Sequence, residues 1–241
     1  MKVDILAIGV HPDDIELSCA GTLLKFIDEG KTVGLLDLTE GELGTRGSVE
    51  KRYEEAERAR EIMGASFRKN LQMADGFFRN TPENVRKIIE VVRYCQPEIA
   101  LVNAPSDRHP DHGRAAKLTA DALYYSGLKM IATEYEGVAQ EKWRPRAVYH
   151  YIQDHQLEPD FVQDITGYMD RKMECILAYD SQFHTGGTAS DQGDQTPISG
   201  RDFMDYMRGR ARVYGRPAGF DYGEGFIKTR ALGVRSLFDL V

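Results

Sequence analysis

The tetrapeptide His11-Pro12-Asp13-Asp14 is the feature that most constrains how this chain folds. A short apolar run, Val3 to Val10, precedes it and is typical of a buried parallel strand, and a helical pattern from Ile15 to about Glu29 follows it. The tetrapeptide therefore lies where a strand ends and a helix begins. In open α/β sheets the carboxyl ends of the strands form the ligand crevice, and the free N–H groups of a helix N-terminus face the same place. We expect an α/β fold with its chemistry at this junction.

The residue types in this tetrapeptide suit a divalent metal ion. An imidazole at His11 and a carboxylate at Asp14 can converge on one ion, while the carboxylate between them, Asp13, stays available as a base. The alternative is that both carboxylates only cap the helix, because acidic side chains are favoured in any first helical turn. For this motif taken alone, both interpretations stay open.

A second motif of the same kind lies about a hundred residues later. The run Glu98 to Asn103 is again strand-like, and the chain then reaches His109-Pro110-Asp111-His112 just before a helical stretch from Gly113 to Tyr125. Half of the 6 histidines lie in these two motifs. Solvated loops would not be expected to repeat such an arrangement, so the pair favours one crevice that both motifs face.

With both motifs in view, the sequence resembles the PIG-L/LmbE-like zinc-dependent N-deacetylases. The loop Gly41-Glu42-Leu43-Gly44-Thr45-Arg46-Gly47 and the segment Tyr222-Gly223-Glu224-Gly225-Phe226 extend the resemblance over nearly the whole chain. They are similar to the bacillithiol-pathway branch, which deacetylates N-acetylglucosaminyl-malate. The resemblance implies a Rossmann-like three-layer fold with a mostly parallel central sheet and the site at the C-terminal ends of the strands. It also implies Zn²⁺, with Fe²⁺ as the alternative in the cell, and a homo-oligomer, either a hexamer or a trimer.

The same resemblance implies roles for individual residues. His11, Asp14 and His112 match the metal ligands, and Asp13 matches the general base. His109 matches the residue that stabilises the tetrahedral oxyanion or protonates the leaving amine, and Asp111 would orient His109. Arg52 matches a substrate arginine, which suits a carboxylate such as that of malate. The predicted substrate-binding residues are Glu42, Arg46, Arg52 and Arg108.

Composition limits the architecture and the partners. A chain of 241 residues with no linker, repeat or composition break is predicted to form a single domain over residues 1–241. The net charge of −7 argues against nucleic acid and would repel an acidic substrate, which therefore needs local arginines. No signal peptide or membrane span is expected, because the first apolar run is short and contains Asp4. The cysteines form no CxxC motif and are predicted to be core thiols of a cytoplasmic protein: Cys19, Cys95 and Cys175.

The remaining signals are weaker. His150 and His155 could be ligands, but a lone histidine in or after a strand is more often structural. Residues 184–200 are rich in small and polar residues, which predicts a mobile loop that could act as a lid. His184 stands where the family branch often has a tyrosine, so the role of that tyrosine is not carried over.

These observations together predict an amide hydrolase that acts on a small N-acetylated amino sugar, with N-acetylglucosaminyl-malate as the favoured substrate and acetate as a product. A metal held by three protein ligands keeps a position for water, lowers the pKa of that water and polarises the carbonyl that it attacks. A generic deacetylase of chitooligosaccharides or other N-acetylglucosamine conjugates is the first alternative. An Fe(II) oxygenase could use the same two histidines and one carboxylate, although Asp13 as an adjacent base favours hydrolysis. A non-catalytic metal- or sugar-binding protein is the third alternative.

Overall fold

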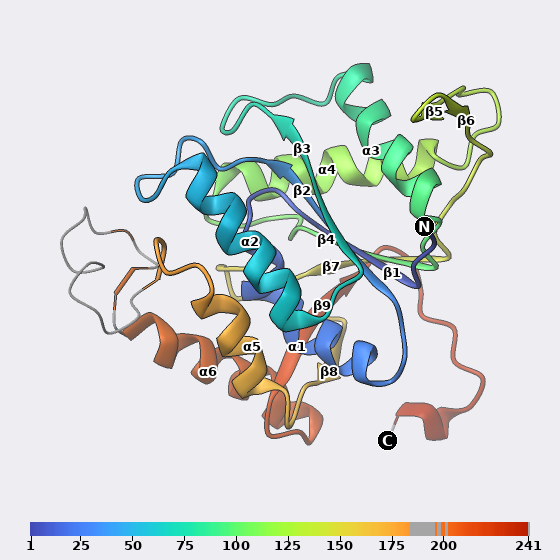
Figure 1. Ribbon diagram of the computed structural model, residues 1–241. Helices are drawn as coiled ribbons and strands as arrows, with labels where there is room; N and C mark the ends of the chain where they lie inside the picture. The colour runs from blue at the N-terminus through green and yellow to red at the C-terminus, as the bar shows by residue number, and fades with distance from the viewer. Residues whose placement is uncertain (184–195, 197–198, 201, 241) are drawn as a thin grey trace.

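The computed structural model describes residues 1–183, 196, 199–200 and 202–240. Its centre is a seven-stranded sheet with helices on both faces (Figure 1), which confirms the predicted α/β, Rossmann-like three-layer fold. The five strands that pair in parallel are β1 (Ile5–Gly9), β2 (Val33–Thr39), β3 (Phe67–Met73), β4 (Ile99–Val102) and β7 (Ala147–Tyr151). The two antiparallel strands at the other edge are β8 (Phe161–Asp164) and β9 (Gly223–Lys228).

Two sets of helices cover the sheet (Figure 1). The helices of the first face are α3 (Pro82–Cys95) and α4 (Pro110–Tyr125), and a two-stranded hairpin of β5 (Glu134–Tyr135) and β6 (Val138–Ala139) lies beside α3. The helices of the second face are α1 (Asp14–Asp28), α2 (Val49–Met63), α5 (Met169–Leu177) and α6 (Asp202–Gly215). Short 3-10 turns follow at η1 (Arg216–Ala218) and η2 (Leu237–Leu240). Within the described residues, no helix combines the length and the apolar composition needed to cross a membrane.

The apolar core explains why the central strands form. In β1, Leu6 and Ile8 pack toward α3 and α4, whereas Ile5 and Ala7 pack toward α1. A strand with helices on both faces needs apolar side chains at successive positions, and the sequence of β1 provides them. The three cysteines are buried and free, as predicted for core thiols.

The strand order places the two histidine motifs beside each other. The sheet runs β3-β2-β1-β4-β7-β9-β8, so the order reverses between β1 and β4. Ile5 of β1 is level with Val33 on one side and with Ile99 on the other, so the carboxyl ends of these strands reach the same edge of the sheet. Ligands of open α/β sheets bind at such a reversal. Residues 11–14 follow β1, and residues 109–112 follow β4.

A buried ion cluster joins β2, β3 and α1 beneath this edge. The Arg68 guanidinium donates to both carboxylate oxygens of Asp37, at 2.6 and 2.8 Å, and to Glu16 at 2.6 Å. All three side chains are almost completely shielded from water. Burial raises the pKa of Asp37 although Arg68 opposes that shift.

We expect Arg68→Leu to lower the free energy of unfolding by about 3–5 kcal/mol, because two carboxylates would remain buried without a counter-charge. Urea unfolding followed by circular dichroism measures this loss. Arg58→Leu is the matched control, since Arg58 pairs with Asp180 at the surface and such pairs contribute about 0–1 kcal/mol. Equal losses in the two variants would contradict the assignment.

The segment Tyr222 to Phe226 also has a structural role. Glu224 of β9 accepts hydrogen bonds from the backbone N–H groups of Gly21 and Thr22 in the middle of α1, at 3.0 and 2.7 Å. The same carboxylate accepts from Lys172 of α5 at 2.6 Å. A side chain at Gly223 would collide with Val162, because its Cβ would lie 2.4 Å from the nearest valine carbon. The glycine therefore lets β9 lie close against β8 at the position beside Glu224.

Candidate active site

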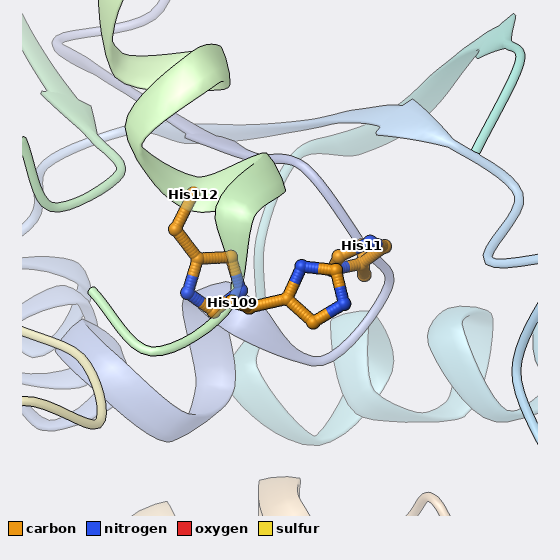
Figure 2. Close-up of side chains that lie close together, drawn as sticks. All are labelled: His11, His109 and His112. Atoms are coloured by element: carbon orange, nitrogen blue, oxygen red, sulfur yellow. The ribbon is translucent and has the colours of Figure 1, made fainter. Parts of the chain in front are cut away.

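Three histidine rings gather at the strand reversal (Figure 2). The ring centroids of His11 and His109 are 4.8 Å apart, and those of His109 and His112 are 5.2 Å apart. Proline is the first residue of α4, where its missing N–H costs nothing, and His109 caps that helix by accepting the backbone N–H of Asp111. The short segment from His109 to His112 thus brings two imidazoles close to the imidazole of His11, which follows β1.

Asp14 is the carboxylate at the centre of the site. Its Oδ2 accepts hydrogen bonds from the backbone N–H groups of Val10 and His11 and from the Asn103 amide, and its Oδ1 accepts one from Gln153. Burial would raise the pKa of Asp14, but the neighbouring His112 and His11 imidazoles lower it below its usual value. The side chain points back to the strand end rather than along the helix, so it is not a helix cap.

His11 and His112 present the same pattern of contacts. The Nε2 atom of His11 is 3.0 Å from Asp75 Oδ1, and the Nδ1 atom of His112 bonds to Asp107. The other ring nitrogen of each histidine faces Asp14: His11 Nδ1 at 3.8 Å and His112 Nε2 at 3.2 Å. Burial alone would lower both pKa values, but the carboxylates raise the pKa of His11 to about 10 and that of His112 to about 9.

One pair of this donor set has the spacing of two ligands on one zinc ion. Two ligand atoms bonded to zinc at about 2.0–2.1 Å lie roughly 3.3 Å apart, and His112 Nε2 lies 3.2 Å from Asp14 Oδ1. A carboxylate on the outer nitrogen of a ligating histidine is the usual support of such a site. Within the described residues, two groups bring all of their potential ligand atoms within 4.8 Å of one another, and neither contains Asp14: His11 with His109 and His112, and His11 with Asp75 and Asp111.

Asp13 adopts a conformation that side chains rarely tolerate. Its φ is 130°, and its carboxylate makes no capping hydrogen bond to α1. Arg52 of α2 lies beneath it, with NH1 donating to the Pro12 carbonyl at 2.9 Å and lying 3.5 Å from Asp13 Oδ2. Burial raises the pKa of Asp13 to about 7, against the lowering effect of Arg52. A strained carboxylate whose proton affinity lies near neutrality suits a general base.

The carboxylate of Asp111, which we expected to orient His109, contacts other groups in the structure. The carboxylate of Asp111 accepts the Gly76 N–H at 2.9 Å and Arg114 at 2.6 Å, and it lies 3.7 Å from His11 Nε2. The His109 ring is already engaged by the backbone N–H of Asp111, so the side chain of Asp111 turns to the loop after β3 and supports His11 instead. Burial and the two other imidazoles lower the pKa of His109.

The four predicted substrate-binding residues do not lie together. Arg52 and Arg108 line the cavity at the site, whose volume is about 330 Å³. Arg108 forms an ion pair with Asp154. Arg46 donates to the Ser181 carbonyl at 2.8 Å, and Glu42 accepts the Asp75 N–H at 2.7 Å. Within the described residues, neither Arg46 nor Glu42 is among those that line the cavity.

Sequence reasoning missed several supporting residues. Asn103 and Gln153, which hold Asp14, come directly after β4 and soon after β7, and Asp75 comes just after β3. Position at a strand end was the signal that could have identified them. His150 is structural, since its ring bonds to the Asn103 carbonyl at 2.6 Å, and His155 is exposed. His184 and most of the predicted loop 184–200 lie outside the described residues.

Comparisons with known proteins show what the chain is similar to. The family model described as PIG-L, GlcNAc-PI de-N-acetylase, matches residues 6–123. The diacetylchitobiose deacetylase of Thermococcus kodakarensis is 29% identical over 92% of this chain and 81% of its own. The probable N-acetyl-alpha-D-glucosaminyl L-malate deacetylase 2 of Bacillus anthracis is 26% identical over 75% of this chain and 82% of its own. The crystal structure of the conserved protein TT1542 from Thermus thermophilus has a TM-score of 0.83 and 32% identity, covering 97% of this chain and 98% of that one.

Proposed function

Because the chain belongs to the PIG-L family and is a hydrolase of amide bonds, we propose that it removes the N-acetyl group from an N-acetylglucosamine conjugate. The observation that supports this reaction most is the juxtaposition of Asp13 with the group formed by His11, Asp14 and His112. A base beside a three-ligand metal set is what hydrolysis by a metal-activated water requires. Family membership disfavours both the oxygenase and the non-catalytic binding protein.

The proposed metal ligands are His11, Asp14 and His112, and the proposed metal is zinc. These three side chains would hold the ion, which would lower the pKa of a bound water molecule and polarise the acetyl carbonyl. Asp13 accepts the proton of the attacking water, and Arg52 holds the backbone and the charge of Asp13 in place. His109 lines the cavity with Asp13, where we assign it to the developing oxyanion or the leaving amine.

The next question is which N-acetylglucosamine conjugate is the substrate. N-Acetylglucosaminyl-malate is the substrate that the sequence motifs favour, and it occurs in the name of the Bacillus anthracis relative. Diacetylchitobiose occurs in the name of the Thermococcus kodakarensis relative. The arginines expected to bind malate already donate to protein acceptors: Arg46 to Ser181, Arg52 to Pro12 and Arg108 to Asp154. We therefore propose the broader class, N-acetylglucosamine conjugates, in a cytoplasmic homo-oligomer.

Acetate release tests this proposal. The purified protein is incubated with N-acetylglucosamine, N,N′-diacetylchitobiose and N-acetylglucosaminyl-malate, each with and without a chelator. We expect acetate from at least one of them, loss of activity on chelation and recovery on addition of zinc. The proposed function is wrong if none of them releases acetate, and the metal dependence is wrong if the chelator has no effect.

Arg52→Ala is expected to lower kcat by roughly 10- to 100-fold on every substrate, because the guanidinium positions Asp13 and a displacement of about 1 Å can cost about 100-fold. Steady-state kinetics on the malate conjugate and on N-acetylglucosamine measures the effect. Arg46→Ala is the control, since Arg46 bonds to Ser181 and does not line the cavity. A loss confined to the malate conjugate would instead support Arg52 as a carboxylate-binding residue.

A further inference from the structure

We propose that Gln153 is a further catalytic residue, and that its amide N–H donates a hydrogen bond to the acetyl oxygen of the substrate while that oxygen gains negative charge. This inference rests on the proposed function, because it assigns one more group to the same hydrolysis. Gln153 follows β7 closely and lines the cavity together with Asp13 and His109. Only 4% of its surface is exposed, so its amide is withdrawn from bulk water but open to a ligand in the cavity.

The orientation of the Gln153 amide is fixed by its neighbours. Its Oε1 atom accepts hydrogen bonds from the backbone N–H of Ala104 at 3.1 Å and from the Asn103 amide at 3.0 Å. A backbone N–H can only donate, so a flipped amide would place its own N–H groups against a donor. The Nε2 atom therefore faces the opposite way, toward Asp14 and His112.

The Nε2 atom of Gln153 carries two N–H groups, of which Asp14 engages one. That N–H donates to Asp14 Oδ1 at 3.0 Å. The same nitrogen lies 3.4 Å from His112 Nε2, which is itself 3.2 Å from Asp14 Oδ1. Because these three distances are nearly equal, the directions from the amide nitrogen to the other two atoms diverge far less than the two N–H bonds of an amide do. Within the described residues, the second N–H is therefore left to a ligand beside Asp14 and His112.

Amide hydrolysis creates a charge that this N–H can stabilise. The oxygen of the attacking water forms a bond to the acetyl carbon, one proton of the water goes to Asp13, and the carbonyl π electrons move onto the acetyl oxygen. The C–N bond then breaks, the electrons on that oxygen re-form the carbonyl, and the leaving amine takes up the proton. A donor that is held in place before the reaction stabilises the charged oxygen more than the neutral carbonyl. Gln153 is held by Ala104 and Asn103, and it adds no charge of its own to the site.

Gln153→Met removes the N–H donors at nearly unchanged side-chain volume. We expect kcat on the best N-acetylglucosamine conjugate to fall roughly 100-fold or more, the effect of losing one oxyanion donor, while KM changes by less than about 3-fold. The zinc content should stay near that of the wild type, because three other donors hold Asp14 Oδ2. Gln140→Met is the matched control, since the Gln140 amide donates to the Glu90 carbonyl and is not among the described groups that line the cavity.

A thioacetyl substrate separates this role from a purely structural one. Sulfur is a weak hydrogen-bond acceptor, so the N-thioacetyl analogue of the same conjugate gains little from an N–H donor. The loss of kcat in Gln153→Met should therefore be at least about 10-fold smaller on the thioacetyl analogue than on the acetyl substrate. Gln153→Glu keeps an acceptor for the Ala104 N–H but has no amide N–H, so it should show the same pattern even if Gln153→Met does not fold.

Two kinetic outcomes would overturn the proposal. Equal losses of kcat on the acetyl and thioacetyl substrates would show that Gln153 only positions Asp14. Loss of zinc that accounts for the whole loss of activity would show the same.

A binding measurement makes the test independent of turnover. Acetate presents a negatively charged oxygen of the same kind, so it is titrated calorimetrically into the zinc-loaded wild type and variants. We expect Gln153→Met to weaken acetate binding at least about 10-fold, the effect of a hydrogen bond to a charged group, and Gln140→Met to leave it unchanged. If no conjugate releases acetate, the proposed function fails, while this result still supports Gln153 as a donor to an anionic oxygen in the cavity. Absence of acetate binding by the wild type, or equal binding by the wild type and Gln153→Met, overturns the proposal.

Discussion

Asp13→Asn is expected to lower kcat by roughly two to four orders of magnitude while the fold and the metal content persist. Asparagine has nearly the same shape, so the hydrogen bond from Arg52 to the Pro12 carbonyl can remain. The amide cannot accept a proton from water near neutral pH, whereas burial gives Asp13 a pKa of about 7. The assay is acetate release under saturating substrate, combined with metal analysis and circular dichroism.

Asp180→Asn is the matched control for this variant, because Asp180 is a partly exposed carboxylate that pairs with Lys51 and Arg58. Its kcat should equal that of the wild type. Turnover near the wild-type rate in Asp13→Asn would remove Asp13 from the mechanism. Loss of metal from that variant would show that Asp13 is a ligand rather than a base.

Replacement of a proposed metal ligand is expected to lower activity to a similar extent. The cause is different, because the metal ion is lost rather than the base. His112→Ala leaves Asp14 and His11 as the two remaining members of the set, so the zinc content after dialysis should fall well below one ion per chain and activity should be lost. His11→Ala and Asp14→Ala should behave alike. Metal analysis by mass spectrometry and the acetate assay measure both quantities on one sample.

The supporting carboxylates provide a graded version of this experiment. Asp107→Asn and Asp75→Asn should each weaken metal binding by roughly 10- to 100-fold without abolishing it, because these residues orient His112 and His11. His155→Ala is the control, since that histidine is exposed. Stoichiometric zinc in the triple replacement of His11, Asp14 and His112 would show that the ion lies elsewhere.

The sequence was sufficient to place the two histidine motifs at one site. Each follows an apolar run, and parallel strands bring their carboxyl ends to one edge of a sheet. It was not sufficient to identify Asp75 or Gln153 as partners. Their contacts cross 64 residues to His11 and 139 residues to Asp14, and such pairings depend on loop paths that no local pattern specifies.

The same limit applies to Asp111. The resemblance implies that it orients His109, whereas its carboxylate accepts the Gly76 N–H and lies near His11 in the structure. The strand β9 begins Gly-Glu-Gly, and these residues are depleted in strands. Only its packing against Val162 and α1 reveals why the segment is extended.

The Glu224 contacts have a consequence for biosynthesis. Two central N–H groups of the helix that begins with Asp14 donate to a carboxylate 202 or 203 residues later in the chain. A ribosome must therefore synthesise the chain through β9 before the helix can acquire all of its partners, and contacts of such long range form late in folding. A nascent chain that already contains both histidine motifs is expected to bind metal weakly until β9 has docked.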